Sequence, residues 1–200
     1  MKHLSSIVAL ALLTAACGRN EDAPPVTEAP PPAGDGPAIE TSTATGETAG
    51  TASVQLASTQ GNTANGALKI SAAGGGVQIS GTVQGLAPNS EFGFHVHEKG
   101  DCSAPDATSA GEHFNPTNEA HGKPRSQPHH AGDMLNVRSD EQGVAEVSID
   151  NPAVSLQTGQ PNDILGKALV VHAKPDDYST QPSGNSGDRI ACGVVAVQPN

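Results

Sequence analysis

The sequence predicts an all-β fold, either a β-sandwich or a small barrel. From about Ser53 onward, short runs that alternate apolar and polar residues are separated by Gly, Asn, Pro and Asp, as in strands joined by turns. No segment has convincing helical periodicity. Because 35% of the residues are hydrophobic and 2% aromatic, any core must be built from Val, Ile, Leu and Ala. The length of 200 residues suits one domain plus extra segments.

Eight stretches are expected to be strands because each is short and bounded by turn residues. In chain order they are SVQLAS (53–58), GALKIS (66–71), GVQISGTVQGL (76–86), EFGFHVHE (91–98), GDMLNVRS (132–139), GVAEVSI (143–149), GKALVVHA (166–173) and IACGVVAV (190–197). Two connections are long, at about 100–132 and 174–188. Structureless loops of this length need a reason, and metal binding, a disulfide or an active-site wall would each supply one.

The N-terminal segment 1–17 is expected to be a signal for export. Lys2 is followed by the apolar stretch 4–13 and then by small residues up to Cys17, a stretch too short to span a bilayer. A cysteine directly after Ala-Ala resembles the lipobox of bacterial lipoproteins, although Thr14 stands where Leu is usual. We therefore expect lipidation at Cys17 and a periplasmic or cell-envelope location with a lipid anchor. Ordinary signal cleavage nearby is the alternative.

Composition and charge indicate how the chain beyond the signal is organised and which partners it can have. Residues 18–52 are rich in Pro, Ala, Thr, Gly and Glu, which predicts a disordered tether ahead of a folded domain at 53–200. The formal net charge of −11 argues against a nucleic-acid partner, because phosphate binding needs clustered Lys and Arg. We expect contact with a membrane through the N-terminal lipid alone. Both a monomer and a homodimer are compatible with the sequence.

The cysteine count fits an exported protein. Three cysteines is an odd number in an oxidising compartment, and lipidation of Cys17 would leave Cys102 and Cys192 as one pair. In the chain-entropy model, a disulfide that closes so long a loop contributes roughly 4–5 kcal/mol to stability, less any strain.

Seven histidines lie beyond the signal, at strand positions or in the first long loop. They are His95, His97, His113, His121, His129, His130 and His172. Strand residues two apart point to one face about 6–7 Å apart, so His95 and His97 can converge on one metal. His172 ends the run ALVVH and could approach the same point from another strand, and such rigid imidazoles suit copper or zinc. The alternative for the His-x-His pair is a solvent-facing strand face.

The first long loop adds a second set of candidate ligands. His113, His121, His130 and Asp133 supply three nitrogens and one carboxylate, which is the donor set of a closed tetrahedral zinc site. A loop with so little to bury would gain its order from the metal. His129 and His130 are adjacent and only one need be a ligand, so we expect His129 to be an exposed loop side chain.

Five motifs in order carry a family resemblance: GFHVHE, AGEHFNP, HHAGD, LVVHAK and SGDRIACGVVAV. Together they resemble copper–zinc superoxide dismutase, over the chain from about Ser53 to Gln198. The resemblance implies an eight-stranded Greek-key β-sandwich or flattened barrel. It also implies an enzyme that converts superoxide to dioxygen and hydrogen peroxide, with one copper and one zinc per subunit. Together with the export expected from residues 1–17, this predicts that the enzyme protects the cell envelope.

The resemblance assigns the ligands. Copper is expected at His95, His97, His113 and His172, and zinc at His113, His121, His130 and Asp133. His113 would then bridge the metals through its two ring nitrogens and act in catalysis as a ligand that can also carry a proton. The family spacing of three residues before the aspartate selects His130 over His129.

The resemblance also assigns residues around the metals. Asp176 matches the aspartate that links one copper histidine, His95, to one zinc histidine, His121; a solvated loop carboxylate is the alternative. Cys102 and Cys192 match the family disulfide.

Arg189 matches the catalytic arginine beside the copper, whereas a simple pair with Asp188 or a carbonyl is the alternative. From residue 52 onward, 8 Lys and Arg face 15 Asp and Glu, a formal charge of −7. A positive cleft can still focus an anionic substrate, an effect well known for this enzyme class. Besides Arg189 and the metals, the candidate positive groups are Lys174, Lys123 and Arg125. The second loop has no lysine after Lys174, so we expect only modest steering.

Overall fold

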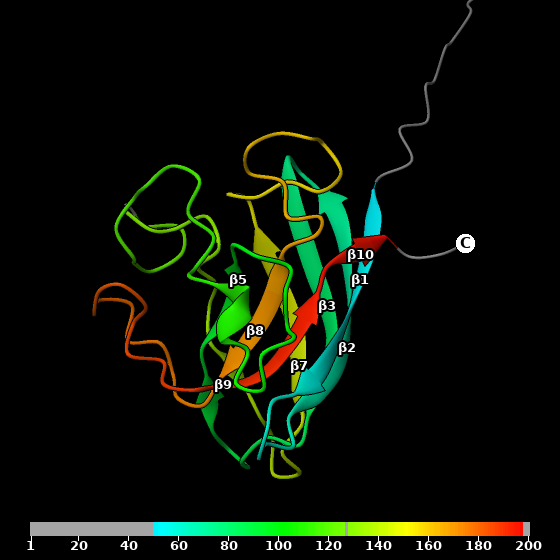
Figure 1. Cartoon of the computed structure of the whole chain (residues 1–200), viewed down its shortest axis with the longest axis vertical. Helices are drawn as coiled ribbons and strands as arrows, with labels where there is room; N and C mark the ends of the chain where they lie inside the picture. The colour runs from blue at the N-terminus through cyan, green and yellow to red at the C-terminus, as the bar shows by residue number, and fades with distance from the viewer. Residues whose placement is uncertain (1–49, 127, 198–200) are drawn as a thin grey trace, which may run out of the picture. The chain divides into compact units, whose positions relative to one another are not determined.

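The prediction of an all-β fold is confirmed by the computed structural model, which describes residues 50–126 and 128–197 (Figure 1). Its strands are β1 (Thr51–Ser58), β2 (Asn65–Ala73), β3 (Gly76–Gln84), β4 (Glu91–Phe92), β5 (Phe94–His97), β6 (Val137–Arg138), β7 (Ala145–Asn151), β8 (Ala168–His172), β9 (Arg189–Val194) and β10 (Ala196–Val197). A single 3-10 turn, Thr108–Ala110, is the one helical element in those residues, and no helix there is long and apolar enough to cross a membrane.

The predicted signal, the lipidation at Cys17 and the tether up to residue 49 lie outside the described residues. Strand β1 begins at Thr51, two residues before the predicted start of the folded domain at Ser53. It buries Ala52, Val54 and Leu56 and turns the residues between them outward, because successive strand side chains point to opposite faces.

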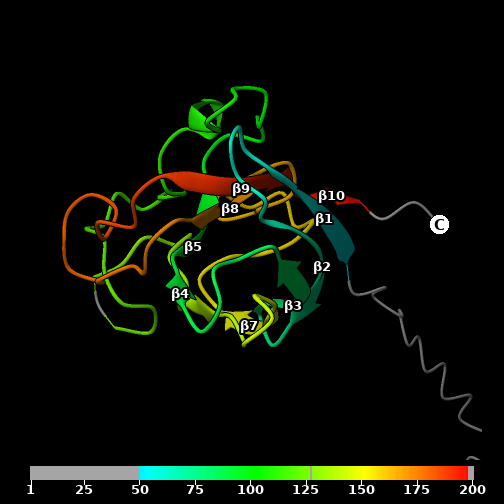
Figure 2. The same cartoon turned by 90° about the horizontal axis from the view of Figure 1, so that it is seen from below.

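The strands form a curled antiparallel sheet. Its order is β5-β8-β9-β1-β2-β3-β7, with β10 paired to β1 and a separate pair β4-β6. Seen along the layers, β8 and β9 lie on one side of the core and β3 and β7 on the other (Figure 2). Val, Ile, Leu and Ala dominate the core, as predicted, and Phe94 is its largest fully buried side chain.

Two predicted strands are each split in two, which gives ten strands instead of eight. The stretch 91–98 breaks at Gly93: β4 before the break pairs with β6, and β5 after the break pairs with β8. A Cβ on Gly93 would lie 2.9 Å from the Ser186 side chain and 3.2 Å from His95 Cε1, so the break brings the chain close to the second long loop. The stretch 190–197 breaks at Val195, between β9 and β10.

The predicted strand 132–139 is wrong over its first half, where only the isolated bridge between Asp133 and His95 resembles a ladder. The Gly132 carbonyl accepts from the Val96 N–H of β5, but the other hydrogen bonds of this half go to loops. The Gly132 N–H donates to the Phe114 carbonyl, and the Asn136 N–H donates to the Tyr178 hydroxyl. The apolar and polar alternation of the segment is therefore real, but most of its hydrogen-bond partners lie in irregular structure.

The second long loop and the later part of the first lie on the same side of the sheet, beyond β5, in both views, whereas the start of the first loop, with its 3-10 turn, lies over β9 in Figure 2 (Figures 1 and 2). The first loop is tied to β9 by a disulfide between Cys102 and Cys192, whose Cα atoms are 5.8 Å apart and which are separated by 90 positions in sequence. A small apolar cluster that includes Ala107, Ala110 and Val170 packs around it. The disulfide and this cluster fix the start of the first loop against the sheet.

Candidate metal centre

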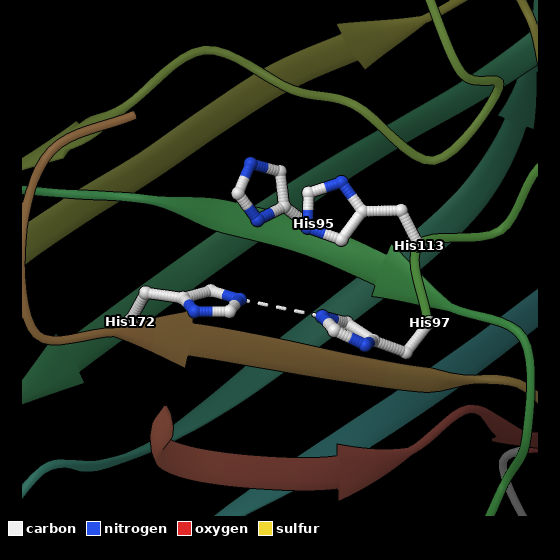
Figure 3. Close-up of side chains that lie close together, drawn as sticks. All are labelled: His95, His97, His113 and His172. Atoms are coloured by element: carbon white, nitrogen blue, oxygen red, sulfur yellow. Dashed lines mark hydrogen bonds between the residues drawn. The ribbon is translucent and has the colours of Figure 1, made fainter. Parts of the chain in front are cut away.

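Four histidines from three parts of the chain meet beside β5 and β8 (Figure 3). This four-histidine group consists of His95, His97, His113 and His172, whose ligand atoms all lie within 4.8 Å of one another. The strand β5 reads Phe-His-Val-His and is buried on both faces, because Phe94 and Val96 enter the core while the loops cover the histidines. A solvent-facing His-x-His pair is therefore excluded.

A second group lies in the first loop. This His3Asp group consists of His113, His121, His130 and Asp133, again with all ligand atoms within 4.8 Å of one another. Asp133 Oδ1 lies 2.8 Å from His113 Nδ1 and 3.3 Å from His130 Nδ1, and its Oδ2 lies 3.1 Å from His121 Nδ1.

The three-residue spacing between His130 and Asp133 has a local cause, because the carboxylate accepts the His130 N–H at 2.8 Å. It also accepts the Gly122 N–H at 3.2 Å, which draws in the neighbour of His121. His129 stays outside the group: it is half-buried, not fully exposed as expected, and its Nδ1–H donates to the His130 carbonyl at 2.7 Å.

Ring nitrogens in these groups have an unusual hydrogen-bond pattern. Four buried nitrogens have no partner in hydrogen-bonding geometry among the described residues: His95 Nδ1, His113 Nε2, His121 Nδ1 and His130 Nδ1. The Asp133 oxygens near His121 Nδ1 and His130 Nδ1 are close but not aligned for a hydrogen bond. Buried polar atoms are nearly always hydrogen-bonded, since desolvation without a partner is costly. All four atoms belong to the two groups, so a ligand in each group would satisfy them.

In His97 and His172, the ring nitrogen that points away from the four-histidine group has a partner. His97 Nδ1–H donates to the Gly111 carbonyl at 2.9 Å, and His172 Nδ1–H donates to the Gly187 carbonyl at 3.2 Å. Each ring therefore carries its proton on the far side and turns a lone pair towards the group; the two Nε2 atoms are 3.3 Å apart. This is the arrangement of metal-binding histidines, and the donor sets suit copper and zinc.

Asp176 connects the two groups. Its Oδ2 accepts from His95 Nε2 at 2.8 Å and its Oδ1 accepts from His121 Nε2 at 2.9 Å. Asp176 is buried, so the alternative of a solvated loop carboxylate is wrong. Asn136 holds it in place, because the Asn136 side chain exchanges hydrogen bonds with the main-chain N–H and C=O of Asp176.

Arg189 is held by two main-chain carbonyls, at 2.6 Å each. Its Nη1 donates to Ala107 and its Nη2 donates to Gly111, the same carbonyl that accepts from His97. In the ladder Arg189 is also the partner of His172. The carbonyl contact and the position beside the histidines, expected as alternatives, thus occur together.

Electrostatics favour the ligand forms of these residues. Burial lowers the pKa of His97 and of His172 well below the ordinary range, and lowers that of His113 to about 4 despite its hydrogen bond to Asp133. These imidazoles therefore stay neutral at pH 7 without a metal. Burial raises the pKa of Asp133, but its hydrogen bond with His113 and its close contacts with His121 and His130 outweigh burial and lower the pKa, so the carboxylate stays ionised.

His121 is the exception among the histidines. Burial lowers its pKa, but the close Asp133 carboxylate and the hydrogen-bonded Asp176 carboxylate outweigh burial and raise it to about 9. Without a metal His121 is therefore protonated at pH 7, so a metal bound to its Nδ1 would have to displace a proton.

Sequence reasoning missed the partners that orient the rings. Gly111, Gly187 and Asn136 act through carbonyl or carboxamide groups in irregular chain, and periodicity does not predict which such group meets a ring or a loop. The glycines beside the ligand motifs were a weak sequence signal for these partners. Gly111 and Gly187 have φ of +73° and +76°, a backbone region that favours glycine.

Comparison with known proteins agrees with this geometry. A model of the copper/zinc superoxide dismutase family matches residues 64–195. The chain is 46% identical to "Superoxide dismutase [Cu-Zn] 2" of Aquifex aeolicus, over 60% of this chain and 72% of that protein. It is 47% identical to "Superoxide dismutase [Cu-Zn] 1" of the same organism, over 60% and 73%.

A solved structure is also similar. The crystal structure of a double mutant of a superoxide dismutase-like protein from Bacillus subtilis matches with a TM-score of 0.66 and 41% identity, over 72% of this chain and 96% of that chain. The chain belongs to the copper/zinc superoxide dismutase family. The predicted enzyme class and the predicted cofactors, copper and zinc, are thereby confirmed.

Proposed function

We propose that the chain removes superoxide with copper held by the four-histidine group and zinc held by the His3Asp group, bridged through His113. One observation carries this assignment. His113 belongs to both groups: its Nδ1 contacts Asp133, while its Nε2 is buried without a hydrogen-bond partner and faces the other histidines. When bound, copper supplies the one-electron chemistry of superoxide dismutation, whereas zinc keeps one oxidation state.

His113 also supplies a proton site. Two superoxide ions and two protons give one dioxygen and one hydrogen peroxide, so each turnover needs protons at the reacting oxygen. Nε2 of His113 is the atom suited to hold one of them, because no other described group competes for its lone pair. Nδ1 stays with the His3Asp group and keeps the ring in position while that proton moves.

Arg189 is the group that attracts and orients the substrate anion. Its two carbonyl bonds fix the guanidinium without neutralising it, and no ion pair consumes its charge among the described residues. A fixed positive charge beside the histidines favours an anion there. The acidic remainder of the domain weakens long-range attraction, so the contribution of steering is small.

Cys17 anchors the enzyme to a membrane of the cell envelope, where it removes superoxide that arises outside the cytoplasm. The lipobox-like segment and the Pro-rich tether support this part of the proposal. Incorporation of radiolabelled fatty acid, abolished by Cys17→Ser, is the expected result. Equal labelling of the unchanged chain and of Cys17→Ser, or no labelling of either, would contradict the lipid anchor.

Two measurements test the metal centre. The purified chain should bind one copper and one zinc and consume superoxide, and His113→Ala should lose activity. With cobalt(II) in place of zinc, magnetic coupling through the shared imidazole should suppress the copper(II) EPR signal. A chain that binds both metals without activity would favour metal storage over catalysis, and an unchanged EPR signal would contradict the bridge.

A further inference from the structure

The main chain at His121 depends on one side chain from the other loop. The His121 N–H donates to Gln181 Oε1 at 2.9 Å, and Gln181 Nε2 donates to the His121 carbonyl at 2.8 Å. No other partner of these two main-chain groups occurs in the described part of the chain. Gln181 therefore pairs with His121 reciprocally, as two residues of an antiparallel ladder do.

The other predicted ligands do not need such a partner. His95, His97 and His172 lie on strands, His113 forms an isolated bridge with His97, and the His130 N–H is bound by Asp133. His121 alone among these ligands lies in irregular chain with neither a ladder nor a local turn to place it. Besides the contacts of Asp133 with the ring and with the Gly122 N–H, the position of the His121 ring therefore depends on the contacts that the second loop makes.

The second loop is itself fixed against His121. Asp176 binds the His121 ring at Nε2, and Gly184 closes over this hydrogen bond. A Cβ on Gly184 would overlap the Asp176 carboxylate and come within 2.7 Å of His121 Nε2, and its φ of +66° also favours glycine. The Gly184 N–H donates to the Thr180 carbonyl at 2.7 Å, so the segment that carries Gln181 is a closed turn.

We propose that Gln181 is a positioning residue for the zinc centre: its carboxamide fixes the backbone of His121 and thereby sets the affinity for zinc. This inference rests on the proposed assignment of His121 to zinc. Partners of this indirect kind typically change metal affinity 10- to 100-fold. Because the Asp176 contact to the ring remains, we expect the lower end, about a tenfold weaker affinity in Gln181→Ala.

The test compares zinc affinities of the metal-free full chain, measured by competition with a chromophoric chelator. Gln181→Ala should raise the Kd for Zn²⁺ about tenfold. Gln181→Glu should also weaken binding, because it keeps an acceptor for the His121 N–H but sets a carboxylate against the His121 carbonyl. Gln142→Ala is the control, since the Gln142 side chain is exposed and makes no hydrogen bond within the described residues.

A spectroscopic readout separates positioning from a general loss of stability. With Co²⁺ as the probe, Gln181→Ala should change the visible absorption bands that report ligand geometry, while thermal unfolding of the metal-free variant should match Gln142→Ala. A Kd for Zn²⁺ within twofold of the control, or an unchanged Co²⁺ spectrum, would overturn the inference. If His121→Ala also leaves zinc binding unchanged, the assignment of His121 to zinc has failed instead.

Discussion

Asp176→Asn is the most informative single substitution in the centre. Asp176 accepts from both His95 and His121, and its hydrogen bonds with these histidines outweigh burial and lower its pKa, so it is ionised at neutral pH. Asparagine has nearly the same shape but only one acceptor oxygen, and its NH₂ group would face one of the two imidazole N–H donors. One ring must therefore lose its partner or turn.

The size of the effect follows from the lost bond. A hydrogen bond to a charged group contributes about 1.5–3 kcal/mol, which corresponds to roughly a 10- to 100-fold change in an equilibrium constant. We therefore expect Asp176→Asn to weaken zinc binding by at least about tenfold, in line with other partners of metal-bound histidines.

Chelator competition on the metal-free chain measures this change, with Asp150→Asn as the control because Asp150 is exposed and its carboxylate makes no hydrogen bond in the described residues. The same titration with copper shows which histidine loses its partner. Zinc and copper affinities that both stay within threefold of the control would refute the reasoning that Asp176 orients the two rings.

Three further results are expected. At pH 7 zinc binding should release a proton, because the pKa of His121 without metal is raised to about 9, and zinc affinity should therefore rise with pH up to about 9. Calorimetry in buffers of different ionisation enthalpy measures the number of protons released. Release of no proton would contradict this prediction. Cys192→Ser should lower the unfolding free energy by about 4–5 kcal/mol in denaturant titrations, since the disulfide joins positions 90 residues apart. It should also lower activity, because the loop carbonyls that hold Arg189 would move. An unfolding free energy equal to that of the unchanged chain would contradict this estimate. Superoxide consumption should fall modestly as salt increases, and Arg189→Gln should reduce both the rate and this salt dependence; a flat or rising curve for the unchanged chain would exclude steering.

Much of the fold could be predicted because strand alternation and turn residues are local signals. The breaks at Gly93 and Val195 could not, because each depends on which neighbour the strand pairs with. The first half of the segment 132–139 was misassigned for the opposite reason: its alternation satisfies packing, whereas most of its hydrogen bonds go to loops. Periodicity reports which side chains are buried and not where the main chain finds its partners.

The candidate site was predictable where a residue type carries the chemistry. Histidines and an aspartate in family order were expected in two groups, and the structure brings the same residues together. Contributions from Gly111, Asn136 and Gln181 depend on a carbonyl or a carboxamide meeting a ring or main-chain group far away in sequence. Such contacts leave no spacing rule in a single sequence.

The position of β5 at the end of the main sheet has a consequence for aggregation. Its outer main-chain groups are occupied by the first loop: the Val96 N–H donates to the Gly132 carbonyl, and the Val96 carbonyl accepts from the Phe114 N–H. The metal loop thus also acts as a cover for a strand edge that could otherwise pair with another molecule. Loss of metal or of the Cys102–Cys192 bond would loosen this cover, so demetallation should favour self-association through β5.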